Sequence, residues 1–125
     1  MATRVFVSFD YDNDARLKDM LIGQSRNPNS PFTVEDWSVK AASSGWRADA
    51  KNRIARSEQV IVLCGHYMGT VTGVNIEIDL ARETGTPYFL LKGLEGATRP
   101  TTAGATDKMY DWTWDNLKLL IAGRR

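Results

Sequence analysis

One acidic residue, Glu77, interrupts an otherwise regular amphipathic pattern. Residues 74–83 read Val-Asn-Ile-Glu-Ile-Asp-Leu-Ala-Arg-Glu, and at about 100° per residue most of the polar side chains share one arc. That polar arc holds Asn75, Asp79, Arg82 and Glu83. Glu77 falls in the opposite, apolar arc, between Leu80 and Ala81. We therefore expect this helix to point a single carboxylate toward the protein interior.

An unpaired carboxylate in the interior costs several kcal/mol, so Glu77 needs either compensation or a function. Two structural explanations are open: the helix dipole, if Glu77 lies in the first turns, and an ion pair with Arg53 or Arg56. The functional explanation places Glu77 in a cleft below the loop 65–73. There its carboxylate could bind ribose hydroxyls and stabilise the oxocarbenium-like sugar formed when a glycosidic bond breaks.

The elements that must position Glu77 follow from the hydrophobic pattern. Short apolar runs predict strands at 4–9, 32–37, 59–64 and 87–92, with a short edge strand at 108–110. Helical spacing predicts helices at 12–24, 46–57 and 74–84, and a last helix that begins near Thr113. In the helix 12–24 we expect Leu17, Met20 and Leu21 to share the buried face.

Alternating strands and helices predict a parallel sheet covered on both faces, a small three-layer α/β fold. Ligands of such folds bind outside the carboxyl ends of the strands. The residues that follow the predicted strands are therefore the candidates for a site: 9–11, 37–38, 64–66 and Lys92.

Several common α/β chemistries lack their motifs. The turn after the first strand has no glycine, which excludes a dinucleotide-binding Gly-x-Gly-x-x-Gly loop, and no phosphate-binding P-loop is present. A phospho-receiver site needs an aspartate after the third strand, where the chain has Cys64, Gly65 and His66. His66 is the single histidine and Cys64 the single cysteine, so a zinc cluster or a hydrolase triad is not supported, and we expect no metal.

The composition describes one domain, which we place at 1–125. The chain has 125 residues and a formal net charge of +1, without the basic excess of a nucleic-acid-binding protein. No apolar run approaches the ~20 residues of a membrane span, and no signal peptide is visible. We therefore expect a cytoplasmic protein that binds neither nucleic acid nor membrane.

Three segments together resemble TIR-like domains. The strand 4–9 runs into the acidic and aromatic loop Asp10-Tyr11-Asp12-Asn13-Asp14, as the first strand of that family does. Residues 54–65 look like its second helix and central strand, and residues 74–81 look like its Trp-Val-x-x-Glu-Ile-x-x-Ala helix. The nearest resemblance is to the TIR-like proteins of bacterial Thoeris anti-phage defence systems, over residues 4–92.

The resemblance implies a flavodoxin-like TIR fold with strand order 2-1-3-4-5. It also implies an enzyme that takes NAD as substrate rather than as cofactor and cleaves its nicotinamide–ribose bond. In the Thoeris group the implied product is a cyclic ADP-ribose isomer that activates a separate effector protein. Self-association is a further expectation. By position, the resemblance makes Glu77 the catalytic residue and Phe9, Asp10, Ser38, Trp46 and His66 the substrate-binding residues.

Other interpretations remain open at this stage. The chain could be a TIR interaction or scaffold module without turnover, or an enzyme similar to nucleoside deoxyribosyltransferases, which use a carboxylate nucleophile. Phe9 and Trp37 could be core residues, and Asp10 could be only a turn or helix-capping residue. Tyr67 and Met68 could form an exposed self-association patch.

Overall fold

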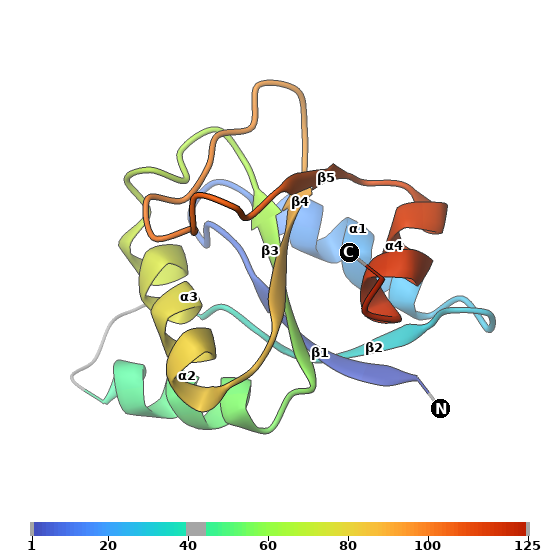
Figure 1. Ribbon diagram of the computed structural model, residues 1–125, viewed down its shortest axis with the longest axis horizontal. Helices are drawn as coiled ribbons and strands as arrows, with labels where there is room; N and C mark the ends of the chain where they lie inside the picture. Colours follow the sequence, from blue (N-terminus) through green and yellow to red (C-terminus); the bar gives the residue numbers. More distant parts are fainter. Residues whose placement is uncertain (1, 40–44, 125) are drawn as a thin grey trace.

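The computed structural model describes residues 2–39 and 45–124. Five strands and four helices alternate through most of this chain (Figure 1). The strands are β1 (Thr3–Ser8), β2 (Phe32–Trp37), β3 (Gln59–Cys64), β4 (Tyr88–Lys92) and β5 (Met109–Asp111). The helices are α1 (Ala15–Ser25), α2 (Trp46–Ala55), α3 (Thr72–Thr84) and α4 (Trp114–Ile121).

The strands form one parallel sheet in the order β2-β1-β3-β4-β5. Helices α2 and α3 cover one face of the sheet, and α1 and α4 cover the other (Figure 1). The three-layer α/β architecture and its strand order are therefore confirmed. Because the chain moves from the centre of the sheet first to β2 and then to β4, the switch point lies between β1 and β3.

The strand β3 holds the two layers together because it is buried along its whole length. Its alternating side chains point to opposite faces: Ile61 and Leu63 join the core under α1 and α4, whereas Val60 and Val62 join the core under α2 and α3. Two hydrophobic cores thus share the same central strands.

The helix boundaries differ from the sequence prediction at two N-termini. Helix α1 begins at Ala15 rather than at residue 12, because residues 10–14 form a turn in which the Asp10 carbonyl accepts the N–H groups of Asn13 and Asp14. Helix α3 begins earlier than predicted, at Thr72, and ends at Gly85 in the left-handed conformation (φ 70°). Within the described part of the chain, no helix has both the length and the apolar character to cross a membrane.

Three hydrophobic side chains do not lie where the sequence pattern placed them. Met20 is 54% exposed, because the buried face of α1 is narrower and consists of Leu17 and Leu21. Trp37 is exposed as well, at the end of an edge strand, with the Lys18 ammonium over its ring. Met68 is fully buried, so the exposed patch expected of Tyr67 and Met68 is wrong for Met68.

Candidate functional site

A cavity of about 540 Å³ opens at the carboxyl ends of β1 and β2, on the side of the sheet that α3 covers. It is lined by the loop after β1, the end of β2 and the segment that leads into α3. The lining residues are Phe9, Asp10, Tyr11, Asp12, Asn13, Ser38, Val39, Tyr67, Thr70, Val71, Thr72, Gly73 and Glu77. Its position is the one that parallel α/β sheets use for ligands, beside the switch point.

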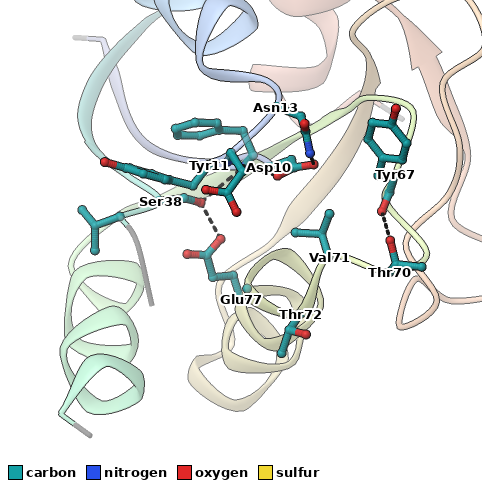
Figure 2. A pocket seen from close by; sticks show the side chains of 13 residues that line it. Asp10, Tyr11, Asn13, Ser38, Tyr67, Thr70, Val71, Thr72 and Glu77 are labelled. Atoms are coloured by element: carbon teal, nitrogen blue, oxygen red, sulfur yellow. Dashed lines mark hydrogen bonds between the residues drawn. The ribbon is translucent and has the colours of Figure 1, made fainter. Parts of the chain in front are cut away.

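Glu77 lies at the bottom of this cavity and is 1% exposed. Ser8 Oγ donates a hydrogen bond of 2.7 Å and Ser38 Oγ one of 2.6 Å, both to Glu77 Oε1. No residue of the described ranges donates to Oε2 in the same way. In Figure 2 the carboxylate reaches from α3 toward Ser38, with Asp10 and Tyr11 beyond it and Tyr67 and Thr70 across the cavity. Among the described residues, the protein therefore holds Oε1 through two donors and gives Oε2 none.

Burial raises the pKa of Glu77 to about 7, and the hydrogen bonds from Ser38 and Ser8 lower it only in part. The hydroxyl donors favour the charged form, but no positive charge in the described part of the chain offsets the loss of water. Glu77 is thus a carboxyl group that changes its protonation state near neutral pH, as carboxyl groups at active sites often do.

The structure excludes both structural explanations for the inward carboxylate. The Arg53 guanidinium contacts Asp36 and Asp49, Arg56 is exposed, and no ion pair within the described ranges includes Glu77. Glu77 also lies beyond the first turn of α3, which begins at Thr72, so the helix N-terminus is not its partner. The interior position of Glu77 is confirmed, and among the described residues only the two serine hydroxyls compensate its burial.

Ser38 joins three elements at the site. Its Oγ accepts the Phe9 N–H at 3.1 Å while it donates to Glu77, and its own N–H donates to the Val7 carbonyl. The end of β2 is therefore tied to β1 and to α3 through one residue. Phe9 is 2% exposed, so most of its ring belongs to the core and its edge lines the cavity.

Asp10 lines the cavity and also organises the loop after β1. Its Oδ1 accepts the Asp12 N–H at 3.2 Å, and its Oδ2 accepts from Asn13 Nδ2 at 2.8 Å. The side chain is 3% exposed, so the turn consumes most of its hydrogen-bonding capacity. The structure thus brings Phe9, Asp10 and Ser38 together with Glu77 around one cavity.

Trp46 and His66 are not among the described residues that line it. Trp46 packs beneath the start of α3, where a Cβ added to Gly73 would lie 3.9 Å from the indole ring. The His66 ring is exposed and makes a 2.9 Å hydrogen bond with the Glu95 carbonyl. Both residues are near the site, and their assignment to substrate binding stays a prediction.

Ser8 is a site residue that the sequence reasoning missed. The signal was available: strand alternation places Ser8 on the same face as Phe6, which packs in the core beneath α3. Tyr67, Thr70 and Val71 were missed as well, because a loop carries no period that predicts which side chains face a cavity.

The described residues contain no group of three or more His, Cys, Asp or Glu side chains that could hold a metal ion. Burial raises the pKa of the Cys64 thiol to about 12, so this cysteine is not an activated nucleophile. The polar and aromatic side chains that the described residues bring to the cavity are therefore carboxyl, hydroxyl, amide and aromatic groups.

A parallel sheet in the order 2-1-3-4-5 is the flavodoxin-like α/β architecture, and here an acidic residue, Glu77, lies beside its switch point. Residues 6–93 match the family described as Thoeris protein ThsB, TIR-like domain, and the chain belongs to that family. The match includes Ser8, Ser38 and Glu77. No curated protein matches the chain. Membership of a Thoeris family indicates a role in anti-phage defence.

Proposed function

We propose that this protein cleaves the nicotinamide–ribose bond of NAD, with Glu77 as the catalytic residue. The observation that carries the proposal is the environment of Glu77: a carboxylate at the bottom of a cavity, held by two serine hydroxyls through Oε1, with no donor to Oε2 and no cation beside it among residues 2–39 and 45–124. A carboxylate with a merely structural role would have a positive partner or a full set of donors.

The proposed bond cleavage uses this arrangement of Glu77. Glu77 Oε2 accepts hydrogen bonds from the ribose hydroxyls of the bound substrate and places negative charge beside the ribose ring. The bond between ribose C1′ and the pyridine nitrogen breaks, its electron pair stays on that nitrogen, and neutral nicotinamide leaves. The positive charge that develops on the ribose is stabilised by the carboxylate. Water or an adenine nitrogen then attacks C1′ and releases a proton.

The ionised form of Glu77 is the active one in this mechanism. Because its pKa is about 7, the reaction rate rises with pH through about 7 and levels off above it.

Attack by the adenine nitrogen gives a cyclic ADP-ribose isomer, and attack by water gives the linear product. For a Thoeris domain we propose the cyclic product, as a nucleotide signal that activates a downstream effector protein. Self-association of the chain belongs to the same proposal.

The test is to incubate the purified protein with NAD and to measure free nicotinamide, with the product identified by mass. Glu77→Gln keeps the shape and the acceptor oxygen for Ser8 and Ser38 but removes the charge, so we expect at least about a hundredfold loss of turnover. Glu83→Gln is the matched control, since Glu83 lies on the solvent face of the same helix, paired with Arg47. It should retain wild-type turnover.

Three outcomes decide between the alternatives. Turnover that survives Glu77→Gln removes Glu77 from the mechanism. Absence of turnover at high protein concentration and in extracts of infected cells favours a scaffold module. Release of base from deoxynucleosides, with NAD left intact, indicates chemistry similar to that of the deoxyribosyltransferases.

A further inference from the structure

The side of the cavity across from Asp10 is formed by residues 67–71, which we call the wall segment. Thr70 and Val71 line the cavity on one side and a second hollow of about 250 Å³ on the other. Met68 anchors the segment in the core, but Thr70 is exposed and Val71 is half-buried. The wall segment therefore separates two hollows at Thr70 and Val71. Contacts of its side chains with the core do not by themselves fix the position of these two residues.

The side chain of Asn75 holds the wall segment from behind. Its Nδ2 donates to the Met68 carbonyl at 2.9 Å and to the Val71 carbonyl at 2.8 Å. Both hydrogens of the amide group are thus used on the wall segment. Since Asn75 lies in the first turn of α3, the contacts tie the wall segment to the helix that carries Glu77.

The other end of the same amide is bound by the loop between β4 and β5. Asn75 Oδ1 accepts the Thr102 N–H at 3.0 Å, the Thr102 hydroxyl at 2.8 Å and the Thr101 hydroxyl at 3.2 Å. A single side chain therefore joins the wall segment, α3 and the β4–β5 loop. An asparagine is required, because two donors must point one way and an acceptor the other.

The β4–β5 loop supports the wall segment at a second point. Thr98 Oγ1 accepts the Met68 N–H at 3.0 Å and donates to the His66 carbonyl at 3.1 Å. The loop behind the wall segment is thus fastened at the start of the segment by Thr98 and near its end through Asn75.

We propose that Asn75 is a positioning residue for substrate binding: it holds the wall segment at the distance from Glu77 that the substrate requires. This inference rests on the proposed function, because it takes the cavity as the substrate site. The polar arc of the helix predicts that Asn75 faces solvent. Its network of hydrogen bonds gives it a role in shaping the cavity.

The test variant is Asn75→Asp, which keeps the size and the acceptor for Thr101 and Thr102. It replaces the two N–H donors with an oxygen that repels the Met68 and Val71 carbonyls. We expect amide hydrogen exchange in residues 66–72 to become at least about tenfold faster while exchange in β3 stays unchanged. The KM for NAD should rise about tenfold, and kcat and the pH midpoint near 7 should remain, because the Ser8 and Ser38 contacts of Glu77 are untouched.

Asn116→Asp is the matched control. Asn116 also donates its Nδ2 hydrogen to a backbone carbonyl, that of Asp111 at the end of β5 at 2.9 Å, but it lies on α4 at the other face of the sheet. It should change neither the exchange of residues 66–72 nor the KM. Thr102→Val, a milder variant that removes one donor to Asn75 Oδ1, should shift both measurements in the same direction by a smaller factor.

Unchanged exchange of residues 66–72 in Asn75→Asp would overturn the proposal, and so would faster exchange with an unchanged KM. A fall in kcat with an unchanged KM would also contradict it, since that result would place Asn75 in the chemical step. If the wild-type protein cleaves no NAD, the proposed function fails. The KM is then replaced by the dissociation constant of NAD, measured by calorimetry, which should rise about tenfold in Asn75→Asp.

Discussion

Glu77 is a buried acid whose proton is bound more tightly in the folded protein than in the unfolded chain. The cause is desolvation, which two hydroxyl donors offset only in part. Since this pKa difference changes the free energy of folding, the charge state of Glu77 can be followed without any knowledge of the substrate.

We predict that the stability contribution of Glu77 is lost as the pH rises. The folded pKa of about 7 lies above the ordinary glutamate value of 4.5, which holds in the unfolded chain, so the contribution is fully present below pH 4.5 and disappears as the pH passes through 7. Relative to Glu77→Gln, the wild type should lose about 3 kcal/mol of unfolding free energy over this range. Urea titrations of both proteins between pH 4.5 and 8 measure the difference, and parallel curves would contradict the assignment.

Among the elements, the loop after β1 and the chain just after β3 approach each other closely at Gly65. Asp14 is 5% exposed, and a Cβ on Gly65 would collide with the Asp14 carboxylate. Burial raises the pKa of Asp14, and the nearby Asp10 raises it further. The two segments therefore meet at a glycine because no side chain fits between them.

Two glycine-to-alanine substitutions should change the unfolding free energy in opposite directions. Gly65→Ala forces Asp14 out of its place, and we expect it to lower the unfolding free energy by about 1–3 kcal/mol. Gly23→Ala, within α1 and with nothing within 4 Å of its added Cβ, should raise it by about 0.5–1 kcal/mol. Denaturant unfolding of both variants measures the two shifts, and a neutral Gly65→Ala would show that the loop after β1 adapts freely.

At the scale of the whole molecule, the two cores share strands β1, β3 and β4. Trp46 packs in the core under α2 and α3, whereas Trp112 packs against the core under α1 and α4. The Trp112 indole also donates a 2.7 Å hydrogen bond to Gln24 Oε1. The tryptophans on the two faces are therefore separate reporters of the two layers.

We predict that both layers unfold in a single transition. Leu63→Ala removes a fully buried side chain from one core and should cost about 2–5 kcal/mol. The fluorescence of Trp46, on the opposite face, should show the same decrease in unfolding free energy as that of Trp112. The reason is that β3 contributes side chains to both cores and cannot unfold from one of them alone. Variants that keep one of these tryptophans and replace the others with phenylalanine allow the comparison. A Trp46 transition that remains at the wild-type midpoint would show that the layers unfold independently.

The sequence predicted the helices and strands correctly where the local hydrophobic pattern agrees with the packing in the fold. The strands at 32–37 and 59–64 were predicted with the bounds that the structure has, and the inward direction of Glu77 followed from helical periodicity. The start of α1 and the exposure of Trp37 were not predicted. The first depends on a turn built around Asp10, and the second on β2 being the edge of the sheet.

The sequence by itself determined the α/β class, the helix that carries Glu77 and the side on which this carboxylate lies, because each depends on residues a few positions apart. Only the tertiary structure decided what Glu77 meets. Ser8 and Ser38 reach Oε1 from positions 69 and 39 residues away, and the wall segment depends on Asn75 and the β4–β5 loop. Such contacts arise from strand order and register, which bring distant segments together, whereas the local pattern indicates at most which face of a strand a residue such as Ser8 occupies.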